Sequence, residues 1–194
     1  MQTGIRVRRR VRWALIGAGL LACLSGACAW TVVGEVTRVS DGDTVTLLDR
    51  ERRRHKIRLA GIDAPERQQA WGKVAASALR LALLRRTASA ECDSVDRYGR
   101  AVCTLTLDQQ DVSLAMLNAG LAWHYVAYIR DQTRAEARRY AAAEQDARQA
   151  RRGLWAEHDP TPPWEWRRAM KDRTKARADS QGSKPRRQAI ESML

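Results

Sequence analysis

Five short segments rich in β-branched and other apolar residues restrict the folds that the first two thirds of the chain can adopt. The segments span residues 32–39, 44–48, 56–59, 88–92 and 101–107. Each has the length and composition of a β-strand, and Asp41-Gly42 between the first two is a typical turn signal. The sequence therefore predicts five strands, and we expect residues 61–69, which contain Pro65, to form a loop.

Helical patterns lie between and after these strands. Apolar residues at helical spacing predict a helix over residues 71–86 and a shorter one over residues 114–118. A third predicted helix spans residues 133–152 and begins with a capping box formed by Thr133 and Glu136. Together the patterns predict an α+β fold with a mainly β core, in which about three helices pack around a small closed sheet.

The first 29 residues have the pattern of a secretory signal peptide. Five arginines precede an apolar run over residues 13–24, and Ala27-Cys28-Ala29 offers small residues for cleavage just before Trp30. The run is too short for a comfortable membrane span. We expect a secreted or periplasmic protein without a stable membrane span. A retained anchor, or a lipid attached at Cys23, is the alternative.

The net charge of +13 is concentrated at the two ends of the chain. Residues 30–166 hold 21 basic and 19 acidic residues, whereas residues 167–194 hold nine basic and three acidic ones. We therefore expect one domain over residues 30–159, followed by a strap and a basic, disordered tail over residues 160–194. A basic tail favours binding to polyanions in a salt-dependent way.

Cys92 and Cys103 are the two cysteines that remain after the predicted signal peptide. They flank residues 93–102, the predicted connection between two strands. In an exported chain, two cysteines across a hairpin favour a disulfide. Two buried free thiols, or a metal site, are the less favoured alternatives, because no second Cys or His pair stands near.

Five charged residues in three motifs indicate the chemistry. They are Asp43 in Asp-Gly-Asp-Thr, Arg58, Asp63 and Glu66 around Ile-Asp-Ala-Pro-Glu, and Arg100 in Asp-Arg-Tyr-Gly-Arg. Carboxylates bind hard divalent cations, arginines match phosphate oxygens with a rigid fork of donors, and a further carboxylate can activate water. Alone, Asp43 fits an ordinary turn and Arg58 a solvated strand position, but the set points to phosphoryl transfer.

The order of these motifs resembles that of the staphylococcal nuclease (thermonuclease) family. From about Thr31 to Trp155, the chain carries Asp-Gly-Asp-Thr, Ile-Arg-Leu, Ile-Asp-Ala-Pro-Glu, Asp-Arg-Tyr-Gly-Arg and Arg-Gly-Leu-Trp in sequence. The resemblance implies an OB-fold, a five-stranded barrel suited to oligonucleotides. It also implies a calcium-dependent endonuclease that cuts DNA and RNA, single-stranded or locally open, with low sequence specificity and leaves 3′-phosphate ends.

The resemblance also assigns roles to individual residues. One Ca²⁺ per domain would be held by Asp43, Asp63 and the backbone carbonyl of Ala64, where the best-known member of the family has threonine. Arg58 and Arg100 would bind the scissile phosphate, and Glu66 would activate or orient the attacking water. The candidates for binding the terminal phosphate and the bases are Arg97, Tyr98, Tyr125 and Tyr128.

A second function fits the same fold. A non-catalytic OB-fold module that binds nucleic acid would share the barrel, because a fold does not fix a function. Such a binder would have no need for Asp43, Asp63 and Glu66 beside a polyanion, so the intact carboxylates favour the enzyme. In either case we expect a monomer.

Overall fold

The computed structural model describes residues 29–182. The predicted signal peptide, apart from Ala29, and the last twelve residues of the expected tail lie outside this range. Within it, no helix is both long and apolar enough to cross a membrane.

The core is a barrel of five strands, as the sequence predicts. A sheet with the order β3-β2-β1-β5-β6-β7 is closed by an additional parallel pairing between β3 and β6. All other neighbouring strands of this sheet pair antiparallel. The sixth strand, β7, adds only two residues at the end of the sheet. The strands span Trp30–Val39 (β1), Thr44–Leu48 (β2), Arg54–Leu59 (β3), Thr87–Val95 (β5), Ala101–Leu107 (β6) and Gln110–Asp111 (β7). The predicted OB-type barrel is therefore confirmed.

The interior of the barrel is filled by alternate residues of these strands. Val45, Leu47, Ile57 and Leu59 are among the fully buried side chains of β2 and β3. Because successive side chains of a strand point to opposite faces, Arg58 between the last two is turned toward the other face. The strand periodicity thus excludes Arg58 from the apolar interior.

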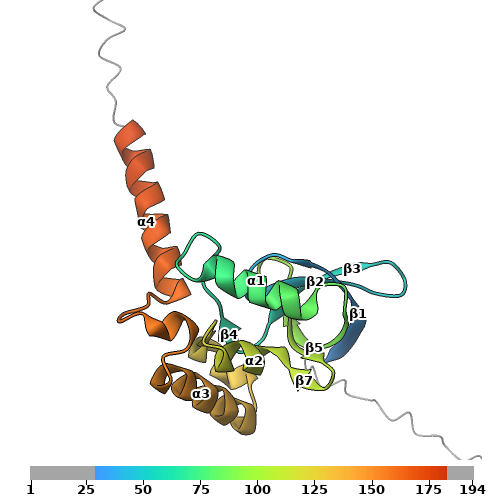
Figure 1. Cartoon of the computed structure of the whole chain (residues 1–194). Helices are drawn as coiled ribbons and strands as arrows, with labels where there is room; N and C mark the ends of the chain where they lie inside the picture. Colours follow the sequence, from blue (N-terminus) through green and yellow to red (C-terminus); the bar gives the residue numbers. More distant parts are fainter. Residues whose placement is uncertain (1–28, 183–194) are drawn as a thin grey trace, which may run out of the picture.

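Three helices pack against the barrel (Figure 1). They span Gly72–Leu83 (α1), Val112–Asn118 (α2) and Arg134–Gln149 (α3). α3 starts with the predicted capping box, and α1 starts after Trp71, whose φ is 66°. The buried face of α1 includes Ala75 and Leu79, whereas Leu81, an apolar residue of the same helix, is 87% exposed.

A second, two-stranded sheet is a feature that the sequence does not predict. Ile62–Asp63 (β4) pairs antiparallel with Trp123–His124 (β8), so part of the predicted loop over residues 61–69 is a short strand. The 3₁₀ helix η1, Val126–Asp131, follows β8. This pairing anchors Asp63 beside Trp123 and fixes where its carboxylate lies.

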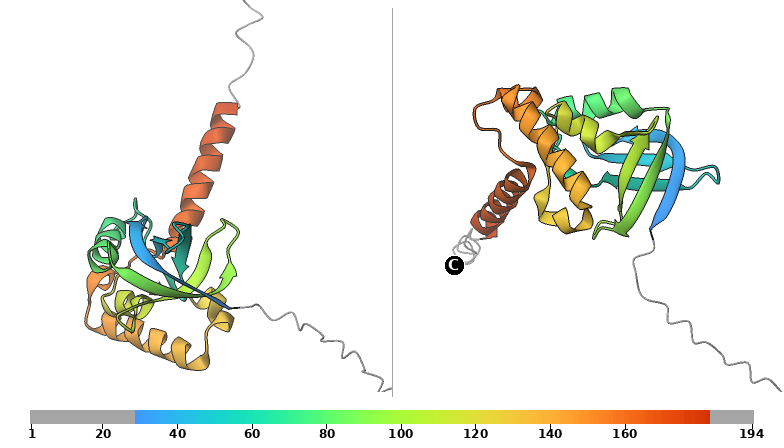
Figure 2. Two further views of the ribbon diagram at one scale, coloured as in Figure 1. Left: turned by 90° about the vertical axis from the view of Figure 1, so that its right-hand side faces the viewer. Right: turned by 90° about the horizontal axis from the view of Figure 1, so that it is seen from below.

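The last element that the structure describes is a helix that leaves the body of the protein. After a 3₁₀ turn over Gly153–Ala156 (η2), α4 spans Pro163–Gly182 and projects outward like a rod (Figures 1 and 2). The sequence predicts disorder over most of this segment. The structure differs because the segment is rich in good helix formers, which can form a helix without an apolar face to bury.

The predicted disulfide between Cys92 and Cys103 is confirmed. The two cysteines face each other in the register of β5 and β6, and their sulfurs are 2.08 Å apart. The bridge joins the two strands that carry the Asp96–Arg100 turn. It therefore holds both sides of the turn that presents Arg100.

Candidate active site

Arg58 joins two buried carboxylates, one from the turn before β2 and one from β4. Its Nη1 lies 2.9 Å from Oδ2 of Asp43, and its Nη2 lies 3.0 Å from Oδ1 of Asp63. The Arg58 side chain is only 13% exposed, and Nη1 also donates a hydrogen bond of 2.8 Å to the carbonyl of Ile62. The structure thus brings together three of the residues that the sequence singles out.

The turn before β2 concentrates negative charge around Asp43. Asp41 Oδ1 accepts a hydrogen bond from the backbone N–H of Asp43, and Oδ2 of Asp43 accepts one from the N–H of Ala64. Burial, together with the neighbouring charge of Asp43, raises the pKa of Asp41 to about 7. Burial also raises the pKa of Asp63, although Arg167 and Arg58 act in the opposite direction.

This donor set fits a hard divalent cation. Two buried carboxylates lie at one place, and burial disfavours the charged form of Asp63, so a bound cation would stabilise this carboxylate in its charged form. Within residues 29–182, no three side chains of His, Cys, Asp or Glu are arranged to hold a metal ion. A cation would therefore have to complete its shell with backbone oxygen and water.

The turn that carries Arg100 also holds its side chain, through the carboxylate of Asp96. Asp96 Oδ1 accepts hydrogen bonds from the N–H groups of Tyr98 and Arg100, and Asp96 Oδ2 accepts one from Arg100 Nε at 2.7 Å. Gly99 has a φ of 74°, a conformation that glycine adopts at little cost. Burial raises the pKa of Asp96, but these hydrogen bonds outweigh it and hold the pKa below its usual range.

Thr44 connects Arg100 to the carboxylate pair. Its hydroxyl accepts a hydrogen bond from Arg100 Nη1 at 3.2 Å and donates one to Asp43 Oδ1 at 2.9 Å. Thr44 is buried, and in the β2–β3 register it lies opposite Arg58. Neither Thr44 nor Asp96 is a predicted site residue, although both belong to the motifs that carry the prediction.

Glu66 lies beside this cluster, and a residue from the far end of the chain contacts it. Arg167, in the first part of α4, places Nη1 2.9 Å from Glu66 Oε1 and Nη2 2.7 Å from Asp63 Oδ2. Burial lowers the pKa of Arg167, but the two carboxylates outweigh this and raise it further above its usual range. Arg167 belongs to the segment predicted to be disordered, so the sequence contains no signal for this contact.

The predicted base-binding residues form two separate groups. Tyr98 is exposed, and the guanidinium carbons of Arg97 and Arg100 lie 4.9 and 5.5 Å from the centre of its ring. The rings of Tyr125 and Tyr128, both in the chain segment that follows β8, have their centres 5.5 Å apart. Tyr125 is tied to the site because its N–H donates to the carbonyl of Gly61, just before β4.

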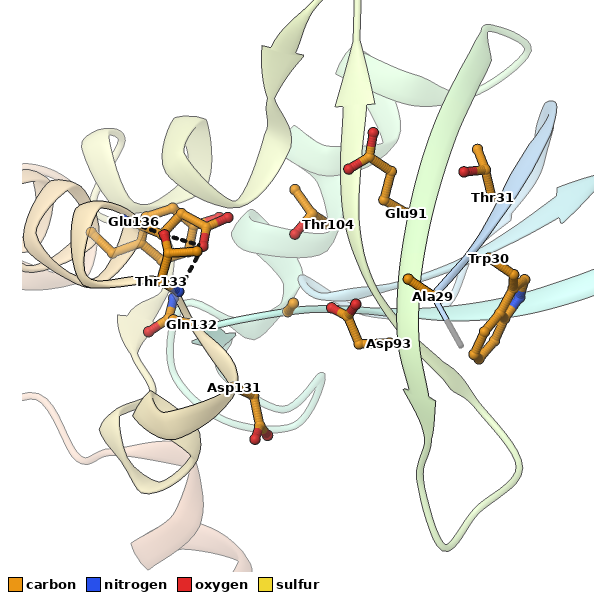
Figure 3. Close-up of a pocket in the computed structure, with 12 residues that line it drawn as sticks. Ala29, Trp30, Thr31, Glu91, Asp93, Thr104, Asp131, Gln132, Thr133 and Glu136 are labelled. Carbon is orange, nitrogen blue, oxygen red and sulfur yellow. Dashed lines mark hydrogen bonds between the residues drawn. The ribbon is translucent and has the colours of Figure 1, made fainter. Parts of the chain in front are cut away.

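A separate groove of about 370 Å³ lies away from this cluster (Figure 3). Its lining includes the carboxylates of Glu91, Asp93, Asp131 and Glu136. Glu136 is already engaged in the capping box of α3. Carboxylates on this wall would repel a phosphate backbone, so this groove does not fit the substrate that the sequence motifs predict.

Comparison with known proteins agrees with the geometry. The family described as "Staphylococcal nuclease homologue" matches residues 56–157. "Protein ParB" of Escherichia coli is 36% identical over 86% of this chain and 98% of its own length. An "Uncharacterized endonuclease" of Escherichia coli O157:H7 is 37% identical over 69% of this chain and 84% of its own length. "Micrococcal nuclease" of Shigella flexneri is 37% identical over 73% of this chain and 83% of its own length.

Proposed function

Because the chain belongs to the staphylococcal nuclease family and is accordingly a nuclease that hydrolyses phosphodiester bonds, we propose that its activity is calcium-dependent. Its substrates would be DNA and RNA, single-stranded or locally open. It would cut them internally with low sequence specificity and leave 3′-phosphate ends. The nuclease domain would span residues 30–159 and act as a monomer.

One observation supports this proposal more than any other. Arg58 contacts both Asp43 and Asp63, while Arg100 reaches Asp43 through the hydroxyl of Thr44. Two guanidiniums and two carboxylates from distant parts of the sequence therefore share one site. If a phosphate bound between the two guanidiniums, they would donate to phosphate oxygens in place of carboxylate oxygens. The fork of donors on arginine matches both groups.

The proposed cation is Ca²⁺, in keeping with a family whose members are generally metal-dependent. Asp43, Asp63 and the carbonyl oxygen of Ala64 would hold it, with water as the remaining ligands. When bound, such a cation neutralises phosphate charge and helps to orient the substrate. The carbonyl of Ala64 is available whatever its side chain, because the backbone supplies the oxygen.

The hydrolysis needs a group that prepares water, and we assign this role to Glu66. Its side chain is 39% exposed. Arg167 contacts both Glu66 and Asp63, so the two carboxylates lie near each other. A carboxylate in this place can orient a water molecule or accept its proton as the oxygen attacks phosphorus. Arg58 and Arg100 would stabilise the charge that grows on the phosphate oxygens, and no covalent enzyme intermediate is needed.

Aromatic residues would hold the rest of the substrate. Tyr98 with Arg97 would meet the terminal phosphate, and Tyr125 and Tyr128 would stack on bases. Stacking on an aromatic ring tolerates any base, which suits the low specificity that we propose.

Export would bring the enzyme to extracellular or periplasmic nucleic acid, and the Cys92–Cys103 disulfide is typical of such compartments. The mass of the exported product would show whether the chain is cleaved near Ala29.

The test is cleavage of single-stranded DNA and of RNA by the purified protein, with calcium or with a chelator, at low and moderate salt. Cleavage that needs calcium, and that is lost in the Arg100→Ala variant, is the expected result. Analysis of the product ends would identify the 3′-phosphate. Equal cleavage in chelator would refute the calcium dependence, and binding without cleavage under every metal condition would favour a nucleic-acid-binding module.

A further inference from the structure

The guanidinium of Arg167 occupies the carboxylate side of the site. Its Nη2 lies 2.7 Å from Oδ2 of Asp63, its Nη1 lies 3.2 Å from Oδ1 of the same carboxylate, and Nη1 also lies 2.9 Å from Oε1 of Glu66. Arg58 contacts Asp63 through Oδ1, whereas the shorter contact of Arg167 is with Oδ2. Arg167 thus contacts a proposed cation ligand, Asp63, and the proposed water-activating group, Glu66.

The segment that precedes Arg167 is fastened to the body of the protein by side-chain contacts. Trp71 Nε1 donates a hydrogen bond of 2.8 Å to Glu157, and Gln69 donates one to the carbonyl of Thr161. Trp164, three residues before Arg167 in α4, packs at 5.6 Å from the ring of Tyr125 and at 6.4 Å from that of Trp123. The first turn of α4 thus delivers Arg167 to the site at high effective concentration.

The side chain can still leave without unseating the helix. The Arg167 side chain is 43% exposed, and the segment is also anchored through other residues, Thr161 and Trp164. A divalent cation that binds Asp63 through Oδ2 would lie at coordination distance from the oxygen that Arg167 Nη2 contacts at 2.7 Å, so the metal ion and this guanidinium would repel each other at close range. Arg167 and the metal are therefore alternatives at this carboxylate.

We propose that Arg167 is a built-in competitor for the divalent cation, so that this residue sets the cation affinity of the site. The inference rests on the proposed metal site. Without the cation, Arg167 compensates the buried charge of Asp63 and occupies the side of this carboxylate that the cation would bind. With the cation, Arg167 moves off the carboxylates toward solvent, where α4 already projects (Figure 2). The enzyme then responds to cation concentration over a higher range than its carboxylates alone would set.

Calcium titration by calorimetry, without nucleic acid, tests the proposal. The full chain is compared with Arg167→Ala and with Arg168→Ala, which removes the same charge from the next, exposed position of α4. We expect calcium to bind Arg167→Ala about tenfold more tightly, since charge-assisted hydrogen bonds no longer oppose it, and Arg168→Ala to bind like the original protein. Equal affinity in all three proteins, or weaker binding by Arg167→Ala, would overturn the proposal.

Two further measurements make the result specific. Asp63→Asn, introduced into both the original and the Arg167→Ala protein, should abolish the binding in each; tight binding that survives would place the cation elsewhere and contradict the proposal. If Arg167→Ala folds poorly, Arg167→Met keeps the aliphatic stem and removes the charge. Calcium should raise the melting temperature of the Arg167 variant more than that of the original protein, because ligand stabilisation follows affinity.

The outcome can be separated from that of the proposed nuclease function. If calcium binds Arg167→Ala more tightly but no protein cleaves nucleic acid with calcium, the competitor role stands and the proposed calcium-dependent activity fails. If the original protein cleaves with calcium while Arg167→Ala and Arg168→Ala bind it equally, the function stands and the competitor role fails.

Discussion

Arg100 donates a hydrogen bond to the hydroxyl of Thr44, 56 positions earlier in the chain, across 3.2 Å. The same hydroxyl donates to Oδ1 of Asp43. One buried oxygen therefore fixes both an arginine proposed to bind phosphate and a carboxylate proposed to bind metal. A conservative change at this oxygen tests whether the site works as a connected unit.

Replacement of Thr44 by valine keeps the shape of the side chain and removes the hydroxyl. We expect kcat to fall about tenfold, because the loss of one or two hydrogen bonds at a buried group costs about 1–2 kcal/mol and loosens both partners. Thr44→Ser keeps the hydroxyl and should retain most of the activity. Steady-state cleavage of single-stranded DNA measures both, and an unchanged rate for the valine variant would mean that Thr44 positions neither residue.

Glu66→Gln should reduce turnover far more than substrate binding. The amide cannot accept a proton from water, and removing a positioned general base costs about 10²–10⁴-fold in rate. Binding of a nucleoside bisphosphate, measured by calorimetry at saturating calcium, should change little. A matching loss of rate and binding would instead assign Glu66 a positioning or structural role.

Arg58→Ala should lose activity and also uncover the repulsion between Asp43 and Asp63. Two buried carboxylates would then lie close together without the guanidinium that joins them, and removing one partner of a buried ion pair costs about 3–5 kcal/mol. We expect a lower melting temperature in chelator than in calcium, with a larger difference than in the original protein. The same melting temperature in both conditions would contradict a cation site at these carboxylates.

Reduction of the Cys92–Cys103 bridge should destabilise the barrel and weaken the presentation of Arg100. The bridge closes a short loop between residues 11 apart in sequence, and the chain-entropy model gives about 3 kcal/mol for such loops. Cys92→Ser with Cys103→Ser should lower the free energy of unfolding in denaturant. Melting curves that coincide with and without reductant would show that the bridge adds no stability.

The Asp96–Arg100 contact predicts how stability depends on pH. The pKa of Asp96 is lower in the folded protein than its ordinary value of about 4, so its contribution is complete above that value and is lost as pH falls through the folded pKa. Asp96→Asn should therefore destabilise the protein at pH 7, and the difference from the original protein should shrink below about pH 4. Denaturant unfolding of both proteins at pH 7 and below about pH 4 measures this difference in stability. A difference that stays the same at the two pH values would contradict the prediction.

Local patterns in the sequence anticipate the barrel and much of the site. The boundaries predicted for residues 44–48 and 101–107 are those of β2 and β6, and the Thr133–Glu136 capping box opens α3 as expected. Turn chemistry, alternation and capping act over a few residues, so the sequence displays them directly. The same holds for the nuclease motifs, whose order places the chain in its family.

Other features depend on partners that are far away in the chain. The pairing of β4 with β8 supplies the setting of Asp63, and neither two-residue strand has a pattern that would reveal it. α4 has no apolar face to mark it as a helix that docks, yet its first turn packs Trp164 on Tyr125. In both cases a partner residue far away in the chain, and not a local pattern, decides where the segment packs.

The sequence by itself determined the five strands of the barrel, the disulfide pair and the set of charged residues that could act on a phosphodiester, because each depends on near neighbours or on motifs in order. The tertiary structure decided which of those charges meet. Arg58 spans Asp43 and Asp63, and Arg167 reaches Asp63 from 104 positions away. Such contacts form because barrel closure and helix docking bring distant segments together, and burial then requires each carboxylate to find a positive partner.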